Sequence, residues 1–469
     1  MRHKRGKEHM VKVGIDAMYV HTPELYVDNS ELAVARGEDP RHFVEGIGIK
    51  SFSVPPPNED QASMAATAAF RLMKTYNIEP SDIFRIDTPT ESGLDASRAL
   101  VSDVVGMLEQ VYGKGSFSHL MGYEQKFACV SGMERLLDSS AWFAAGWNSR
   151  KYALVLVTDI AKYELKSKEE PTQGAAAAAL LIGENPRLLE IIPRAVGSGL
   201  RNEKGDFKKP GGRTIALVDT VGKGRSYAAY LSEMKQAWLN FTSSIKSIGL
   251  YKDDEETSAV DIIDRAGFHN PHKKMVISAY ASLLIHEWRN RPKWNDITSK
   301  IGPEPPRGSM DDLTYYMSKE YNEFRRKFMT LEEFNQDFEK KVGSSLVAPE
   351  LIGNSYAASV FVGLDSIFEN DKESLAQKIL ALCGYGSGSH ALIQATRVSP
   401  ECDTARKELD LMKRLPQRRR LSISEYEEIH QGIIRIDESK VLSKPRFILT
   451  SVGQKGTASE GDREYIFIS

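Results

Sequence analysis

Cysteine is scarce in this chain. Its 469 residues include only three cysteines, Cys129, Cys383 and Cys402, and no two of them have CxxC spacing. We therefore expect neither a disulfide framework nor a metal site, and we expect a reducing, cytoplasmic environment. No apolar run reaches the roughly 18 residues that a membrane span needs, so no membrane segment is expected. The first ten residues are charged and are not followed by the apolar stretch of a signal peptide, so we expect residues 1–10 to form a disordered arm.

An excess of charge of either sign is also missing. The chain has 62 Lys and Arg residues against 64 Asp and Glu residues, a net charge of -2. This balance gives no general attraction to nucleic acid, and we interpret the run Arg418–Arg420 as a solvated surface. With 41% hydrophobic and 27% charged residues, the composition is typical of a globular protein long enough for two core-forming units.

Helical and strand patterns alternate along the chain, which indicates an α/β protein with a largely parallel sheet. In the first part, strands are expected at Val11–Met18, Asp82–Asp87, Tyr152–Thr158 and Ala175–Ile182, and helices at Glu31–Arg36, Glu59–Tyr76 and Ser131–Phe143. In the second part, helices are expected at Tyr227–Ile248, Val276–Arg289 and Asn354–Phe368, and strands at Ala259–Phe268, Ile379–Cys383, Arg446–Ser451 and Glu464–Ile468. We predict two α/β halves, 11–200 and 201–469, that share a cleft, with a charged helical insertion near 303–345.

Cys129 is the first candidate for chemistry. It lies at or just before the start of the predicted Ser131–Phe143 helix. Free N–H groups and the helix dipole at that position favour a thiolate. A small apolar core residue fits the same window, so other residues must decide.

Two ionisable residues follow predicted strands, where open sheets build their sites. Glu91 comes after Asp82–Asp87, and His269 follows Ala259–Phe268. A single glutamate or histidine is more often solvated or structural. The Gly-rich segment Gly384–Ser389 can bring backbone N–H groups to a ligand, but it lacks the spacing of a P-loop or dinucleotide fingerprint.

Taken in order, these segments resemble the 3-hydroxy-3-methylglutaryl-CoA synthase family of thiolase-fold condensing enzymes. The segments that carry the resemblance are Thr90-Glu91, Ala128-Cys129, Tyr152–Tyr163, Glu170–Gly174, Phe268–Pro271, Asn354–Tyr356 and Tyr385–Gly388. Each is weak alone, and the ordered set is specific. The resemblance implies a thiolase-like fold with two pseudo-equivalent αβαβα halves, layered sheets and buried central helices.

The resemblance also implies an activity, an early step of the mevalonate pathway to isoprenoids. Acetyl-CoA, acetoacetyl-CoA and water would give 3-hydroxy-3-methylglutaryl-CoA and CoA. Cys129 would be the acetylated nucleophile, Glu91 the general acid/base, and His269 the residue that positions the acetoacetyl carbonyl and donates a proton. Backbone N–H groups of Cys129 and Ser387 would form the oxyanion hole.

Further residues are carried over in supporting roles. Those expected to bind substrate or CoA are Tyr163, Thr172, Lys274, Asn354, Tyr356, Gly386 and Ser387. Asp159 and Asp219 are expected to support the pocket, and Asp219 matches only through the pair Val218-Asp219. No metal or other cofactor is implied, because the CoA thioesters are substrates. The family implies a homodimer, and archaeal relatives can also assemble with acetoacetyl-CoA thiolase and a small zinc-containing protein.

The chain departs from the family pattern near these residues. Pro89 and Ser92 flank Glu91 where Gly and Thr are usual, and Val130-Ser131 follow Cys129 where an aromatic residue and Gly are usual. The other departures are Met133-Glu134-Arg135, in place of small residues, and Ala357, in place of Thr. They put acyl specificity in question before reaction type, and a charged Glu134-Arg135 pair in a buried helix needs partners.

Three alternatives stay open on the sequence. A related condensing enzyme that acts on carrier-protein-bound acetoacetate would use the same three residues. A ketoacyl synthase III or thiolase-like acyltransferase shares Cys and His, but gives Glu91 no role, and a thiolase needs a second cysteine in a Gly-rich loop, where Cys402 does not lie. A non-enzymatic thiolase-fold scaffold that binds acyl-CoA is the third.

Overall fold

Nine strands form one mixed sheet that divides into two groups. The computed structural model describes residues 11–219, 222, 224–254, 257–433 and 444–469, so the predicted arm at 1–10 lies outside the described residues. The first group has the order β5-β4-β6-β7-β1 and the second the order β8-β11-β10-β9. The strands of the first group are β1 (Val13–His21), β4 (Ile83–Pro89), β5 (Met121–Gln125), β6 (Tyr152–Ala161) and β7 (Gly174–Glu184). Those of the second are β8 (Leu189–Leu200), β9 (Arg265–Phe268), β10 (Ile379–Gly386) and β11 (His390–Val398).

The two groups repeat one topology. In each, an early strand (β4 or β9) pairs in parallel with the next member (β6 or β10), which pairs antiparallel with its successor (β7 or β11). That successor lies antiparallel to the first strand of its own group, β1 or β8. Among the described residues, strands of the two groups pair only where β1 meets β8, through Gly14↔Glu190 and Ile15↔Leu189. The expectation of two pseudo-equivalent halves is thereby confirmed.

The expectation of a largely parallel sheet was wrong. Only the neighbours β4–β5, β4–β6 and β9–β10 run parallel in this sheet, and the other neighbours run antiparallel. Helices cover both faces, so β6 and β7 are buried almost throughout and show the continuous apolar pattern that usually marks parallel strands.

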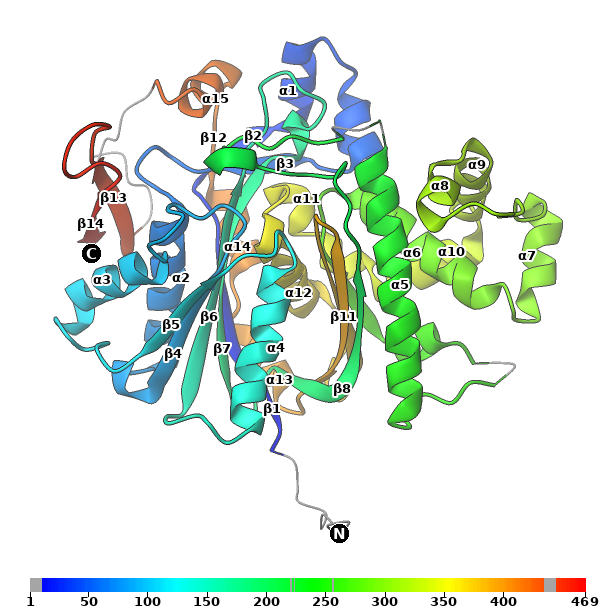
Figure 1. Cartoon of the computed structure of the whole chain (residues 1–469), viewed down its shortest axis with the longest axis horizontal. Coiled ribbons are helices and arrows are strands. Elements are labelled where there is room, and N and C mark those ends of the chain that lie inside the picture. The colour runs from blue at the N-terminus through cyan, green and yellow to red at the C-terminus, as the bar shows by residue number, and fades with distance from the viewer. Residues whose placement is uncertain (1–10, 220–221, 223, 255–256, 434–443) are drawn as a thin grey trace.

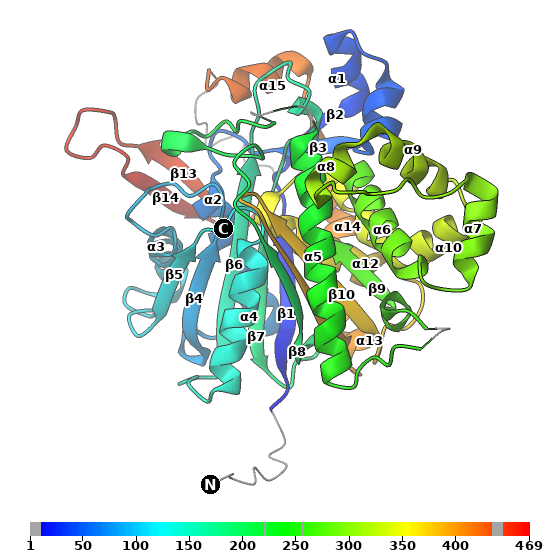
Figure 2. The same ribbon diagram turned by 45° about the vertical axis from the view of Figure 1, so that its right-hand side comes forward.

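Helices separate the chain into layers. Helices α4 (Ser131–Ala144) and α12 (Ser359–Asn370) lie in the centre, α4 against β6 and β7 and α12 against β9 and β10. Helices α2 (Gln61–Tyr76) and α3 (Val101–Tyr112) cover the outer face of the first group, while α5 (Arg225–Ser247) covers β8 and β11. Figures 1 and 2 show this order, with α4 and α12 inside and α2 and α5 on opposite sides.

Close packing of the central helices depends on Gly132. A Cβ on this residue would lie 2.9 Å from side-chain atoms of Phe361 and Val157 and 3.1 Å from the Ala357 carbonyl oxygen. The first turn of α4 therefore sits directly against α12 and β6. Because Cys129 lies two residues before α4, this contact also fixes its position relative to the sheet.

Several predicted elements change at their ends. Residues Ala259–Ile262 form a 3-10 turn rather than strand, because Ser258 and Asp261 cap each other's backbone there. Gly384–Gly386 continue strand β10, so the Gly-rich loop is shorter than expected. The sequence analysis did not predict β8, β11 or helix α7 (Lys293–Ile301). The predicted charged insertion is a set of helices beside α6 (Lys273–Trp288), namely α8 (Asp312–Met317), α9 (Lys319–Phe328) and α10 (Glu332–Lys341).

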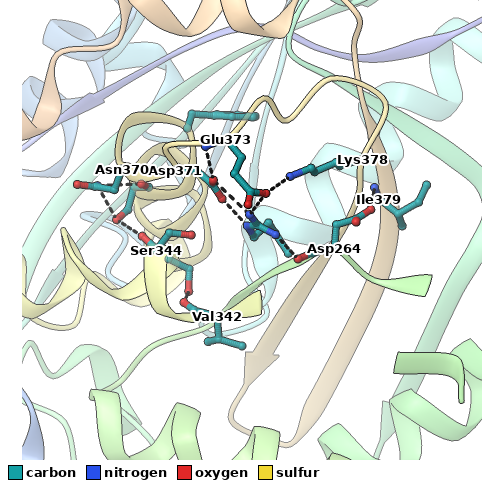
Figure 3. A network of polar contacts seen from close by, with 12 residues as sticks. Asp264, Val342, Ser344, Asn370, Asp371, Glu373, Lys378 and Ile379 are labelled. Carbon is teal, nitrogen blue, oxygen red and sulfur yellow. Dashed lines mark hydrogen bonds and ion pairs between the residues drawn. The ribbon is translucent and has the colours of Figure 1, made fainter. Parts of the chain in front are cut away.

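Strand β9 is short, and ion pairs anchor its start. Asp264 accepts a hydrogen bond from the Ile379 backbone N–H of β10 (2.8 Å), and Arg265 pairs with Asp371 and Glu373, just after α12. Figure 3 shows Asp264, Asp371 and Glu373 converging at this corner. The network holds the edge strand whose other end carries His269.

The C-terminal strands form a separate hairpin, β13 (Arg446–Val452) and β14 (Arg463–Ile468). Phe447 and Phe467 pack their rings against Phe70 of α2, at centroid distances of 6.2 and 5.0 Å. In the part of the chain that the structure describes, no helix is both long and apolar enough to cross a membrane.

Candidate active site

Glu91 and Cys129 meet where the first group of strands faces α4. Glu91 follows β4 and Cys129 follows β5, and these two strands are parallel neighbours, so their carboxyl ends lie together. The Cys129 thiol donates a hydrogen bond to Glu91 Oε2, at 2.6 Å. An acid and a sulfur 38 positions apart in the chain therefore form one unit.

The turn that carries Cys129 is strained and closely packed. Ala128 has φ of +43°, a conformation that costs a non-glycine residue energy and often marks a functional site. A Cβ on Gly386 would lie 2.7 Å from the Phe127 carbonyl oxygen and 2.9 Å from the Val130 amide nitrogen. Only glycine lets the end of β10 approach the nucleophile's backbone this closely.

Asp159, near the end of β6, fixes the loop that presents Glu91. Its Oδ1 accepts hydrogen bonds from the backbone N–H groups of Glu91 and Ser92 (both 2.9 Å) and from the hydroxyls of Thr90 (2.9 Å) and Ser92 (2.5 Å). Its Oδ2 accepts from the Ala357 N–H at 3.0 Å. The departures at positions 92 and 357 keep this function, because serine supplies the hydroxyl of the usual Thr and Ala357 contributes its backbone.

The protonation state of the Glu91–Cys129 pair differs from the sequence prediction, which was a thiolate at Cys129. Burial, opposed by Lys209, raises the pKa of Glu91 to about 7. Burial and the adjacent Glu91 carboxylate raise the pKa of Cys129 well above its usual value. In the first turn of α4, the backbone N–H groups of Ser131 and Met133 donate to the carbonyls of Ala128 and Val130 rather than to the sulfur. Above about pH 7 the pair is a thiol bonded to a carboxylate, which is a stronger base than an ordinary glutamate.

His269 is buried at the end of β9, the strand equivalent to β4. Its backbone N–H donates to the Cys383 carbonyl (2.7 Å), and its Nδ1 lies 2.6 Å from the Ser359 hydroxyl. Burial, opposed by a hydrogen bond to the Tyr356 backbone, lowers the pKa of His269 to about 3. The imidazole is neutral near pH 7, and it can orient a substrate carbonyl with the N–H group that it donates to the Tyr356 backbone in this structure.

An aromatic wall lies between these groups. The rings of Tyr163, Phe207 and Tyr356 meet edge to face, with centroids 5.4 to 6.4 Å apart, and pack in one cluster with Cys129. Tyr356 is itself strained, with φ of +44°, and Asn354 Oδ1 accepts from its N–H at 2.9 Å. The Tyr163 phenol lies close enough to the side chains of Tyr356 and Asn354 for both to act on it.

A cavity of about 1010 Å³ opens in front of this wall. Glu91, Ala128, Lys209 and Ser387 line it, with further polar residues nearer the mouth. Cys129 and His269 are buried behind the lining, at 6% and 2% exposure. A ligand in the cavity would thus reach the thiol past Glu91.

Two residues of the site were missed on sequence, Asp206 and Lys209. The Asp206 carboxylate accepts from the Tyr385 hydroxyl (2.6 Å), bonds the Ser387 side chain and acts electrostatically on Glu91. Lys209 lines the cavity beside Glu91. The charged segment 203–209 (EKGDFKK) was a signal, but it contains no pattern that separates these residues from a surface loop.

Asp219 binds backbone groups at the start of α5 in the structure, and its supporting role in the pocket stays a prediction. Its carboxylate accepts from the backbone N–H groups of Gly224 (2.7 Å) and Ser226 (2.8 Å), so it caps the start of α5. The carboxylate that faces the site from this segment is that of Asp206.

The remaining residues predicted to bind substrate or CoA differ in their location relative to the cavity. Asn354 and Thr172 are buried together, with the Asn354 N–H donating to the Thr172 carbonyl at 3.1 Å. Lys274 lies exposed in the first turn of α6, outside the cavity lining. Ser387 follows β10 and lines the cavity, and Gly386 precedes it.

The charged pair of α4 has partners. Glu134 accepts from Gln125 (2.7 Å) and lies 2.9 Å from the His390 Nδ1. Arg135 lies 3.5 Å from Asp138 and 3.9 Å from Asp87. The departure at these positions is therefore compensated within the fold and lies away from the thiol.

Together these groups can perform acyl transfer and carbon–carbon bond formation. A thiol with an adjacent base can form a thioester, and a desolvated carboxylate with a pKa near 7 can then remove a proton beside a carbonyl. A buried neutral imidazole can orient a second carbonyl.

Comparison with known proteins agrees with this chemistry. A family model described as hydroxymethylglutaryl-coenzyme A synthase N terminal matches residues 9–187, and one described as hydroxymethylglutaryl-coenzyme A synthase C terminal matches residues 205–445. Hydroxymethylglutaryl-CoA synthase of Haloferax volcanii is 34% identical over 429 residues, which cover 90% of this chain and 92% of the relative. The Saccharomyces cerevisiae protein of that name is 26% identical over 438 residues, covering 92% and 84%.

Solved structures extend the likeness to the fold. MvaS in complex with 3-hydroxy-3-methylglutaryl coenzyme A superposes with a TM-score of 0.80 at 28% identity, covering 97% of this chain and 99% of that chain. The HMG synthase of the curacin biosynthetic pathway, solved with apo donor-ACP, has a TM-score of 0.76 at 21% identity, covering 97% and 100%, and shows a likeness of fold alone. The expected thiolase-like fold is confirmed.

Proposed function

The chain belongs to the hydroxymethylglutaryl-CoA synthase family, and from this premise we propose that Cys129, Glu91 and His269 perform its acyl transfer and condensation. As a member, the chain is an acyltransferase that condenses acetyl-CoA with acetoacetyl-CoA and water to 3-hydroxy-3-methylglutaryl-CoA and CoA. The hydrogen bond between the Cys129 thiol and Glu91 is the observation that carries the assignment of residues.

Acylation begins at the sulfur. Glu91 takes the thiol proton as Cys129 attacks the acetyl-CoA carbonyl; the C–S bond to CoA breaks, and CoA leaves with that proton. The backbone N–H groups of Cys129 and Ser387 stabilise the oxyanion. The close approach of Gly386 to the Cys129 turn supports this pairing, because it brings the start of the 387 turn to the nucleophile.

Condensation uses Glu91 a second time. Its carboxylate removes a proton from the acetyl methyl group, and the resulting carbanion equivalent attacks the ketone carbon of acetoacetyl-CoA. His269 holds that ketone by a hydrogen bond, which suits an imidazole that is neutral at pH 7, and the Glu91 proton passes to the new alkoxide. Water then cleaves the Cys129 thioester and releases the product with a free carboxylate.

The remaining roles follow the family pattern. Tyr163 and Tyr356 line the acyl end of the site, Asn354 and Thr172 contact the thioester arm of the substrate, and Asp159 holds the Glu91 loop. Lys274 meets a CoA phosphate at the surface of α6, where its exposure leaves it free to bind an anion. The chemistry asks for no metal or redox cofactor beyond these groups.

We also propose the setting of the enzyme. The two halves divide before β8, since that strand pairs with β11 of the second group, although the chain boundary was expected near residue 200. A homodimer, a cytoplasmic location and a place early in the mevalonate pathway follow from the family. Assembly with an acetoacetyl-CoA thiolase and a small zinc-containing protein belongs to the same proposal.

The acceptor is the point on which the carrier-protein alternative differs. We propose free acetoacetyl-CoA, supported by the 34% identity to the Haloferax volcanii synthase across nearly the whole chain. Turnover of acetoacetyl-CoA should exceed that of acetoacetyl carrier protein under matched conditions. Condensation only with the carrier-bound substrate would reverse this choice and leave the roles of Cys129 and Glu91 standing.

A further inference from the structure

Lys209 belongs to a loop that folds over the nucleophile. The backbone of Lys208 pairs with that of Leu217 (3.0 and 2.9 Å), and the Ala216 N–H donates to the Lys162 carbonyl just after β6 (3.2 Å). We call residues 206–218 the cover loop. Ala216 of this loop packs in the same cluster as Cys129, so the loop lies against the site from the cavity side.

The Lys209 ammonium is buried and unpaired. Its Nζ is shielded from solvent and has no hydrogen-bond partner among the described residues. It lies 4.4 Å from the centroid of the Tyr356 ring and 5.7 Å from that of Phe207. Aromatic faces attract a cation, but only by about 0.5–2 kcal/mol, less than the cost of burying an ammonium. The rings therefore account for its position only in part.

Negative groups around it account for the rest. Glu91 and Asp159 are carboxylates of the site, and the Lys209 charge acts on both and on the Cys129 thiol, favouring the ionised form of each. Asp206 faces Glu91 from the same cover loop and disfavours its ionised form.

Lys126, Lys162, Lys208 and Arg213 also line the cavity, but they are not among the groups that act most strongly on Glu91. The phenols of Tyr163 and Tyr356 face the pair, and burial raises the pKa of each, so both stay neutral. His269 is neutral as well. Among the residues that act most strongly on Glu91, Lys209 is the one cation, set against the Asp159 and Asp206 carboxylates.

We propose that Lys209 is a positioning residue of the reaction: its ammonium holds the Glu91 carboxylate ionised beside the Cys129 thiol, ready to accept the thiol proton. This inference rests on the proposed function of the site. Without the cation, the burial of Glu91 and two neighbouring carboxylates would favour its protonated form. The thiol would then have no base at neutral pH.

The test measures thiol reactivity without any acyl-CoA. Iodoacetamide alkylates thiolates, so the rate of Cys129 modification from pH 5.5 to 9, followed by intact-protein mass, reports how readily the thiol proton is removed. The wild type should show an inflection near pH 7, and Glu91→Gln should lack it, which assigns the inflection to Glu91. Cys129→Ser identifies the modified residue.

Lys209→Met should move that inflection upward by at least one pH unit and slow alkylation at pH 7 by about tenfold. Lys209→Arg keeps the charge and should stay within about half a pH unit of the wild type. Lys204→Met, on the exposed chain just before the cover loop and outside the cavity lining, is the matched control and should match the wild type.

An unchanged inflection in Lys209→Met, or an equal shift in Lys209→Arg and Lys209→Met, would overturn the inference. If Lys209→Met does not fold, as judged by circular dichroism, Lys209→Gln takes its place against Lys209→Arg. The outcome is separable from failure of the proposed function, which would appear as a wild-type enzyme that alkylates normally but is never acetylated by acetyl-CoA.

Discussion

Replacing Glu91 by Gln should separate the two chemical steps. Condensation needs a carboxylate to remove the methyl proton, and general base catalysis of this kind contributes about 10²–10⁴-fold, so this step should fall by at least about 100-fold. Acylation should survive better. Loss of the Glu91 charge removes one of the causes that raise the pKa of Cys129, which partly offsets the loss of the base.

The size of the effect of Glu91→Gln follows from the pKa of Glu91, which is about 7 against an ordinary value of 4.5. Such a carboxylate holds its proton about 3 kcal/mol more strongly than an ordinary glutamate. Wild-type acylation should rise between pH 6 and 8 and then level off, whereas in Glu91→Gln it should climb steadily with pH and come within about tenfold of the wild type at pH 8.

The free energy of unfolding should fall as pH rises, opposite to the rise of the acylation rate. The folded protein binds the Glu91 proton more tightly than the unfolded chain, so folding stability is lost as pH rises from about 4.5 through 7. Glu91→Gln should therefore be more stable than the wild type at pH 8, by up to about 3 kcal/mol, and no more stable at pH 4.5. Rapid-quench acylation, single-turnover condensation and urea unfolding measure these quantities. An equal loss of both chemical steps would refute the role of Glu91 as the condensing base.

Four further substitutions test the surrounding structure. Gly386→Ala adds a methyl group that must displace the Cys129 turn. It should therefore lower the free energy of unfolding by about 1–3 kcal/mol and slow acylation at least tenfold. Unchanged acylation would mean that the turn tolerates movement. Asp206→Asn removes a negative charge that faces Glu91 and should move the acylation inflection to lower pH. Asp219→Asn should leave the inflection in place and lower the free energy of unfolding by about 1 kcal/mol. The reverse pattern would return Asp219 to the site. Arg265→Ala strands the buried Asp371 carboxylate and should lower stability by about 3–5 kcal/mol in urea, and a loss below 1 kcal/mol would show that the anchor of β9 is not needed.

The positions of Glu91 and His269 at strand ends could be predicted from the sequence, and their catalytic roles stay predictions. Glu91 and His269 follow β4 and β9, which occupy equivalent places in the two groups of strands. The helices expected at Glu31–Arg36 and Glu59–Tyr76 are present as α1 (Asn29–Arg36) and α2, because their sequence patterns are local signals.

Other features depend on contacts that a single sequence does not record. The direction of β6 and β7 was unpredictable because both faces are buried, which erases the alternating pattern. The protonation of Cys129 depends on burial and on Glu91, a partner 38 positions away. Asp206 and Lys209 looked like surface charges because nothing local shows that their loop folds back onto the nucleophile.

Mass spectrometry of the intact protein tests the central claim most directly. Incubation with acetyl-CoA should add one acetyl group, located on Cys129 by peptide mapping and absent in Cys129→Ser, and a chase with acetoacetyl-CoA should remove it as 3-hydroxy-3-methylglutaryl-CoA forms. Acetylation elsewhere, or an acetyl group on Cys129 that the chase leaves in place, would contradict the account.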